Sequence, residues 1–424
     1  MTIISEAAKP LYIYLQRPDT GQWVVVGRYR RGIESSTGIF RYADSYREAG
    51  LAWSIDPVNL PLLDGEFRQH ARYEGLHDVL RDAAPDAWGQ MLIQREHGIP
   101  ANTSLLRYLL FSGNSDRWGA LAVGTSKSPN IAALATPKLP QLTAFVDELL
   151  AIAAFRPPVN ATIRKRLFAA PSMGGARPKM TVQDGTKYWL VKPAVPTDTV
   201  DIALLEHATQ QWGLATGLRF ATTQHHVLTG SRSVVRVKRF DRDGPRRFMA
   251  VSAASLLQTA FPATSAADVG RASYPRLAEE LQRIGAPQED LHELFGRMIF
   301  NAIVGNDDDH PRNHAVIYVH AEGRWRLSPA FDVVPNPDET PNRLFMQVST
   351  GTTAITREAL LADHVRFGLP TMQAAQTLLD ATIVRMRTAY SEIRPLLTDD
   401  LHNLLQLRLD ANSRLLKKSY PLLP

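Results

Sequence analysis

The residues best suited to chemistry in this sequence lie in segment 305–313, which reads GNDDDHPRN. Phosphoryl transfer needs a carboxylate that orients the attacking hydroxyl and accepts its proton. It also needs an asparagine five residues later that holds Mg²⁺. Asp308 and Asn313 have this spacing, whereas the same step from either neighbouring aspartate ends at an arginine or a histidine. The spacing therefore selects Asp308 as the candidate base and Asn313 as a candidate metal ligand.

Two other kinds of metal site fit this segment poorly. His310 and His314 are four residues apart, as zinc ligands on a helix would be, but Pro311 between them would disrupt a helix. As a calcium loop beginning at Asp307, the segment has Arg312 at the sixth position, where glycine is needed, and no glutamate at the twelfth. The remaining alternative is a solvated acidic turn.

Three charged residues elsewhere could complete a site for phosphoryl transfer. Asp332 lies among apolar neighbours in PAFDVVP, where an unpaired carboxylate is costly and a cation would compensate it, although a capping role is the alternative. Lys192 ends the strand-like segment YWLVK and could meet a nucleotide phosphate or simply face solvent. Glu206, in LLEHA on the following helix, could form an ion pair with that lysine.

Adjacent glycines precede the lysine strand in the segment SMGGARPK, which covers residues 172–179. Glycines allow positive φ angles and a close approach of a ligand to main-chain N–H groups, as phosphate binding requires. The segment does not match GxxxxGK[ST], because no second glycine stands directly before Lys179. A tight surface turn is the alternative interpretation.

The elements that must position these residues follow from local patterns. Hairpins are predicted around Asp19-Thr20-Gly21 and around Asp184-Gly185, and a helical region from Glu74 to His97 is broken near Pro85. Strands become scarce after about residue 251, where amphipathic segments dominate. We predict four parts: an N-terminal subdomain (1–124), a Ser/Thr/Pro-rich connector (125–141), a strand-rich nucleotide-binding lobe (142–245) and a helical catalytic lobe (246–424).

Composition narrows the class of protein. The chain has 424 residues, 44% of them hydrophobic, with a formal charge of +6 that is compatible with an anionic ligand or nucleic acid nearby. Because it has no cysteine, neither disulfides nor thiolate metal sites hold it together. We see no signal-peptide pattern and no apolar run of 18 or more residues, so we expect a cytoplasmic protein without a membrane partner.

In their order along the chain, these motifs resemble the HipA-like serine/threonine kinases, which are toxins of type II toxin–antitoxin modules. SMGGARPK is similar to the family's phosphate-binding loop, VKPA to its nucleotide-lysine strand and VKRFDR to its hinge. GNDDDHPRNH is similar to its catalytic loop, LSPAFDVVP to its metal-binding segment, and LRDAAPDAWGQ and SDRWGALAVG to its N-terminal subdomain. The resemblance implies an α+β, bilobal protein-kinase-like fold with a small α/β N-terminal subdomain and a mostly helical C-terminal lobe.

The resemblance also implies a role for each matching residue. Asp308 would be the catalytic base, Asn313 and Asp332 would hold Mg²⁺, and Glu206 would support the nucleotide lysine. The residues that would bind ATP are Gly174, Gly175, Ala176, Lys179, Lys192, Lys238, Phe240 and His310. Ser172 would be an autophosphorylation site, where a phosphate would repel those of ATP and switch the kinase off; the alternative is that its hydroxyl caps the turn.

Partners and substrate follow from the resemblance alone. We expect a helix-turn-helix antitoxin of the HipB type, contact with operator DNA only through that antitoxin, and a protein substrate in translation such as an aminoacyl-tRNA synthetase. Two alternatives stay open. One is a small-molecule phosphotransferase with the same catalytic loop, and the other is a catalytically idle corepressor subunit.

Overall fold

The computed structural model describes residues 10–31, 36–50, 53–70, 72–169, 175–230 and 232–416. The chain forms two compact units, which are described separately. Unit 1 contains residues 1–193, 239–251 and 317–323, and unit 2 contains residues 194–238, 252–316 and 324–424.

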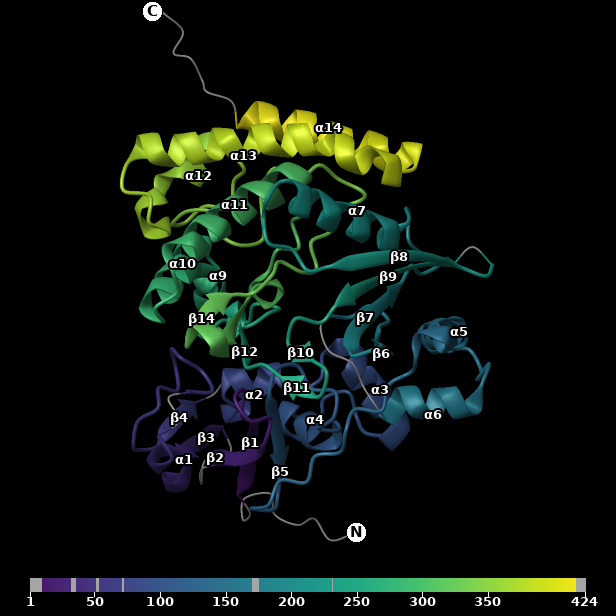
Figure 1. Ribbon diagram of the computed structural model, residues 1–424, viewed down its shortest axis with the longest axis vertical. Helices are drawn as coiled ribbons and strands as arrows, with labels where there is room; N and C mark the ends of the chain where they lie inside the picture. Colours follow the sequence, from purple (N-terminus) through teal and green to yellow (C-terminus); the bar gives the residue numbers. More distant parts are fainter. Residues whose placement is uncertain are drawn as a thin grey trace, which may run out of the picture. The chain divides into compact units, whose positions relative to one another are not determined.

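Unit 1 begins with an antiparallel sheet of five strands, shown in purple and blue in Figure 1. Its members are β1 (Leu11–Gln16), β2 (Trp23–Arg31), β3 (Thr37–Tyr42), β4 (Phe67–His70) and β5 (Leu121–Gly124), in the order β4-β3-β2-β1-β5. The predicted hairpin is present, since Leu11 pairs with Tyr29 and Gln16 with Trp23. Strands β1 and β3 are buried at nearly every position, and large side chains such as Phe40 form part of the core.

Helices and a second hairpin complete unit 1. The helical elements are α1 (Asp44–Glu48), η1 (Arg72–Gly75), α2 (Asp78–Asp82), α3 (Ala87–His97), α4 (Leu105–Phe111), η2 (Leu139–Gln141), α5 (Leu142–Ala153), α6 (Ala161–Ala169) and η4 (His320–Glu322). Asp86 caps α3 by accepting a hydrogen bond from the Gly89 amide at 2.7 Å, and Gly98 ends the helix at a φ of 62°. The predicted break near Pro85 is therefore confirmed.

Four further strands belong to unit 1. They are β6 (Met180–Asp184) and β7 (Lys187–Pro193), then β10 (Arg242–Asp243) and β11 (Arg246–Arg247). Gly185, at a φ of 60°, makes the tight turn between β6 and β7 that the Asp-Gly pair predicted. Two more strands, β12 (Ala250–Ser252) and β13 (Ala315–Val319), each contain residues of both units.

Unit 2 is mostly helical and contains one hairpin, formed by β8 (Thr223–Leu228) and β9 (Arg232–Lys238), as well as β14 (Arg324–Leu327). Its helical elements are α7 (Ile202–Ala215), α8 (Ala253–Leu256), α9 (Ala266–Arg271), α10 (Tyr274–Arg283), α11 (Gln288–Val304), η3 (Pro311–Asn313), α12 (Arg357–Ala362), η5 (His364–Phe367), α13 (Met372–Ile393), η6 (Arg394–Leu396) and α14 (Asp399–Leu415).

The core of unit 2 forms where α7, α11 and α13 meet. Trp212 of α7 is fully buried, packs edge-on against Phe300 and Tyr390, and donates a hydrogen bond to the Met386 carbonyl at 2.8 Å. Helices α13 and α14, the yellow pair in Figure 1, are joined by a hydrogen bond between the Tyr390 hydroxyl and His402. This packing makes α11 a rigid support for the loop that follows it.

The division into units cuts the chain differently from the four predicted parts. Strands β6 and β7 belong to unit 1, whereas β8 and β9 belong to unit 2, although the sequence analysis placed all four in one lobe. The four-part division stays a prediction. Within the described residues, no helix is long and apolar enough to span a membrane.

Candidate functional site

Helix α11 leads directly into the segment GNDDDHPRN. The helix ends at Gly305, whose φ of 72° lies in the left-handed region, and the chain is irregular from there to the short helix η3. The side-chain amide of Asn313 donates a hydrogen bond to the Asp308 main-chain carbonyl at 2.9 Å. The loop thus brings the predicted base and the predicted metal ligand together, and it leaves the Asn313 amide oxygen available to a cation.

The Asp308 carboxylate lies in an acidic environment. Its side chain is 76% exposed, yet loss of hydration, followed by the negative charges of Asp332 and Asp307, raises its pKa to about 6. The Coulomb effect shows that Asp308 and Asp332 are electrostatic neighbours in unit 2.

Asp332 is held in an unusual backbone conformation. Its φ is 58°, which is uncommon for a residue with a side chain. Two residues earlier, Ala330 forms a parallel bridge with Phe220, in which the Ala330 amide donates to the Arg219 carbonyl and the Ala330 carbonyl accepts from the Ala221 amide, both at 2.8 Å. The bridge fixes the backbone directly before the carboxylate.

These residues suit a hard divalent cation. Carboxylate and amide oxygens are the kind of ligand that Mg²⁺ prefers. A cation would also relieve the repulsion between the two carboxylates. In the part of the chain that the structure describes, no three or more His, Cys, Asp or Glu side chains gather into a metal cluster. Magnesium typically uses one or two carboxylates plus substrate phosphates, so such a cluster is not required.

The other two aspartates of the loop have structural contacts. Asp309 is 1% exposed and accepts hydrogen bonds from the Tyr274 hydroxyl at 2.6 Å and the Phe345 amide at 2.7 Å. Burial raises its pKa to about 7 despite these donors. Asp307 accepts from the side-chain amide of Asn336 at 3.1 Å. Asp309 therefore anchors the loop to distant segments, a role that its position in a turn-like sequence did not reveal.

A second carboxylate stabilises the segment that leads to Asp332. Asp290, in the first turn of α11, has a fully buried side chain. It accepts from the Arg326 guanidinium twice at 2.9 Å, from the Leu327 amide at 2.7 Å and from Arg219 at 2.5 Å. Both chain segments of the Phe220–Ala330 bridge are thereby tied to one helix.

The predicted phosphate loop lies in unit 1. Ser172 and Gly174 are outside the described residues. Gly175 and Ala176 are exposed, and Gly175 has a φ of 86°, as expected for a glycine turn. Lys179 is 3% exposed, and its ammonium lies 3.4 Å from the Asp86 carboxylate that caps α3. Lys179 thus joins the end of the loop to the start of α3 through this ion pair. Its contact with ATP stays a prediction.

The other predicted nucleotide residues are distributed over both units. Lys192 in β7 is 8% exposed and belongs to unit 1, whereas Glu206 in α7 is 3% exposed and belongs to unit 2. Their ion pair therefore stays a prediction. Lys238 and Phe240 are half-buried, and the Lys238 amide donates to the Thr222 carbonyl at 2.8 Å. His310 lies between α11 and η3 in unit 2 and is 8% exposed, and its contact with ATP stays a prediction.

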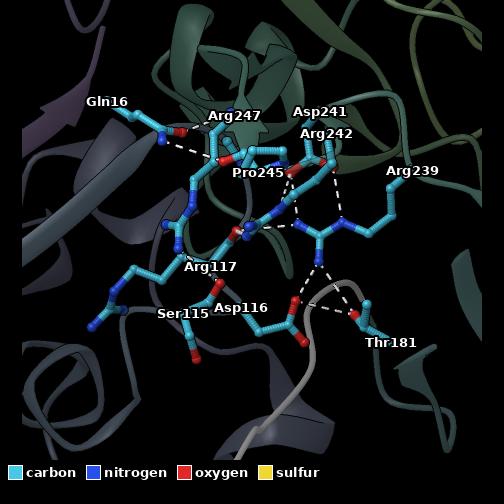
Figure 2. A network of polar contacts seen from close by, with 11 residues as sticks. Gln16, Ser115, Asp116, Arg117, Thr181, Arg239, Asp241, Arg242, Pro245 and Arg247 are labelled. Carbon is cyan, nitrogen blue, oxygen red and sulfur yellow. Dashed lines mark hydrogen bonds and ion pairs between the residues drawn. The ribbon is translucent and has the colours of Figure 1, made fainter. Parts of the chain in front are cut away.

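Figure 2 shows a polar network in unit 1 that the sequence analysis missed. Arg239 donates to Asp241 at 2.9 and 2.7 Å, to Asp116, to Thr181 at 3.2 Å and to the Arg117 carbonyl at 3.1 Å. Burial alone would lower the pKa of Arg239, but the two carboxylates raise it. The neighbouring opposite charges in SDRWG and KRFDR were the signal in the sequence for this network. These two segments are more than 100 residues apart, so the sequence did not show that they pair.

With this geometry established, the chain can be assigned to a family. It belongs to the HipA-like C-terminal domain family, whose model matches residues 171–390, just over half of the chain. A chain from the complex of HipA, HipB and operator DNA of Shewanella oneidensis MR-1 is similar to it, with a TM-score of 0.70 and 16% identity over 96% of this chain and 97% of that one. This likeness confirms the predicted α+β, HipA-type fold.

Two further proteins are similar over shorter stretches. A protein of Sinorhizobium fredii (strain NBRC 101917 / NGR234) named "Putative kinase Y4mE" is 29% identical over 130 residues, which are 28% of this chain and 30% of that protein. The match thus spans less than a third of the curated relative. The kinase CtkA of Helicobacter pylori has a TM-score of 0.43 at 13% identity, over 56% of this chain and 90% of that one.

Proposed function

We propose that this protein is an ATP- and Mg²⁺-dependent serine/threonine protein kinase that acts as the toxin of a HipA/HipB-like module. The observation that carries the proposal is the arrangement in unit 2 of Asp308, Asn313 and Asp332: Asn313 is bonded to the Asp308 main chain, and the charge of Asp332 acts on the exposed Asp308 carboxylate. Membership of the HipA-like family and the kinase name of the Sinorhizobium relative support it.

The residues of this chain divide the work of phosphoryl transfer among them. Asp308 orients the acceptor hydroxyl and takes its proton, while Asn313 and Asp332 hold the metal. When bound, Mg²⁺ neutralises charge on the transferred phosphoryl group. Lys192 adds positive charge at the phosphates, with Glu206 as its proposed partner, while Gly175 and Ala176 offer main-chain amides to them. Catalysis is then positioning combined with charge neutralisation.

Substitution of the aspartates tests the catalytic part of this proposal. We expect Asp308→Asn and Asp332→Asn each to lower transfer of labelled phosphate from ATP by about 100-fold or more, because each removes a charge that acts on the reacting groups. Asp307→Asn is the matched control: it removes a charge that contributes to the raised pKa of Asp308 but is bonded to Asn336, so transfer should fall far less than in the test variants. Transfer at the wild-type rate by either test variant would exclude the proposed roles.

The acceptor and the partner need separate experiments. Phosphoproteomics of cells that express the wild type or Asp308→Asn would identify the protein substrate, which we propose to be a translation component such as an aminoacyl-tRNA synthetase. Mass spectrometry of the purified protein tests autophosphorylation at Ser172. The solved complex of the Shewanella protein contains HipB and operator DNA, which favours a helix-turn-helix antitoxin here. Co-purification with such a protein encoded nearby tests that partner.

A further inference from the structure

His310 is enclosed by aromatic side chains from two distant segments of unit 2. Its ring lies on Phe261 with the ring centres 3.6 Å apart and the planes at 33°, and it meets Phe345 edge-on at 6.2 Å. Phe261 and Phe345 also pack edge to face at 5.1 Å. Only 11% of the His310 side chain is exposed, so little of its surface remains for contact with a ligand.

The segment that carries Phe261 is held in place by one carboxylate. Asp268 in α9 accepts hydrogen bonds from the Ala260 amide at 2.9 Å, from the Thr264 amide and hydroxyl at 3.1 and 2.9 Å, and from the Ser265 hydroxyl at 2.8 Å. These bonds close the loop on either side of Phe261. The backbone on both sides of Phe261 is therefore fixed by this carboxylate, although the residues that follow Phe261 are exposed.

The other aromatic wall is fixed by the catalytic loop itself. The Phe345 amide donates to the buried carboxylate of Asp309, which follows the proposed base in sequence. Tyr274 donates to the same carboxylate and accepts from the side chain of Asn301 in α11 at 2.8 Å. The Phe345 wall is thus joined to the loop by hydrogen bonds to a buried carboxylate, whereas the Phe261 wall meets the loop through its ring contact with His310.

The enclosed ring faces the base. His310 Nε2 lies 3.8 Å from Asp308 Oδ1, close enough for a charged imidazole to form an ion pair with this carboxylate. The Asp308 side chain is otherwise 76% exposed, and an exposed aspartate can leave its productive rotamer at little cost. A fixed ring on one side restricts that freedom.

We propose that His310, held by Phe261 and Phe345, is a positioning residue for the Asp308 carboxylate and sets turnover, with no direct part in nucleotide binding. The inference rests on the proposed function, because it assumes that Asp308 is the base. It differs from the resemblance-based role of His310, which places this side chain against the nucleotide. Loss of a positioning residue should lower turnover and leave ATP affinity unchanged. Loss of a nucleotide contact should weaken ATP binding and leave the saturated rate unchanged.

The test separates these quantities in the full-length protein. Phe261→Leu and His310→Gln are expected to lower the rate at saturating ATP by about 10- to 100-fold, since a small displacement of a catalytic group has effects of this size. The dissociation constant of Mg·ATP, measured by calorimetry, is expected to stay within about twofold of the wild type, because the nucleotide is not touched. Phe261→Tyr keeps the ring and is the matched control, so its rate at saturating ATP should stay close to that of the wild type.

Three outcomes would overturn this inference. The first is weaker ATP binding with unchanged saturated rate in His310→Gln, which would make the ring a nucleotide contact. The second is an unchanged rate and affinity in both test variants. The third is equal loss in Phe261→Leu and Phe261→Tyr. If Phe261→Leu does not fold, His310→Gln decides. Full transfer by Asp308→Asn is a separate result that would exclude the proposed function itself.

Discussion

Removal of one guanidinium from the network of Figure 2 should destabilise unit 1 strongly. Arg239 is the only residue that Asp116 and Asp241 share as a hydrogen-bond donor within the described residues, and all three are at most 6% exposed. In Arg239→Met, two buried carboxylates lose that cation. Breaking a buried pair by removing one partner costs about 3–5 kcal/mol, so we expect a loss of free energy of unfolding of that order.

The remaining donors cannot compensate for this loss. Asp241 would keep the Gly119 amide at 2.9 Å and the Arg242 guanidinium at 4.0 Å, whereas Asp116 would keep the neutral Thr181 hydroxyl at 3.1 Å, so most of the loss falls on Asp116. One neutral hydrogen bond contributes about 0.5–1.5 kcal/mol, which is less than the cost of burying an unpaired charge. The loss of free energy of unfolding in Arg239→Met therefore reflects the removed positive charge more than the number of hydrogen bonds that are lost.

Urea unfolding of the purified variants measures the prediction, and a triple variant tests its cause. Adding Asp116→Asn and Asp241→Asn to Arg239→Met removes all three charges, so much of the lost stability should return. Arg30→Met is the control, because its pair with Glu66 lies at the surface and should contribute no measurable stability. A loss below about 1 kcal/mol in Arg239→Met, or a triple variant less stable than the single one, would refute the reasoning.

The remaining predictions concern unit 2. Asp290→Asn should raise the concentration of Mn²⁺ needed for half-saturation, because it removes the charge that holds Arg326 and the segment leading to Asp332. Electron paramagnetic resonance measures the binding, and an unchanged concentration would contradict this prediction. Gly213→Ala should cost about 1–3 kcal/mol in thermal unfolding, since a new Cβ would lie 2.4 Å from the Phe220 ring. Since the pKa of Asp309 is raised to about 7, its contribution to stability declines as the pH rises from about 4 to 7. In Asp309→Asn this decline should be absent, which urea unfolding across that range would show.

Much of the fold follows from local patterns that a single sequence displays. The turn at Asp184-Gly185 needs a residue with positive φ, and Gly185 supplies it, so the β6–β7 hairpin could be predicted without knowledge of the rest. The five-residue step from Asp308 to Asn313 is also local, and the hydrogen bond between these residues closes the loop as the spacing suggests. Such features depend on a few neighbouring residues and their backbone preferences.

Other features depend on segments that lie far apart in the sequence. Asp308 and Asp309 are identical in type and adjacent, and only the contacts with Tyr274 and Phe345 make one of them a buried anchor while the other stays exposed. A propensity for a turn cannot distinguish them. The distinction comes from which side chain the folded chain covers.

The sequence alone indicated the family and the hairpins, and it predicts Asp308 as the base among three aspartates, because motif order and spacing are properties of the chain itself. Only the tertiary structure decided that His310 lies under Phe261, that Asp332 follows a bridge between Phe220 and Ala330, and that Arg239 joins Asp116 to Asp241. These contacts join residues that pack together when apolar surface is buried. Their partners are fixed by three-dimensional packing, which no local pattern encodes.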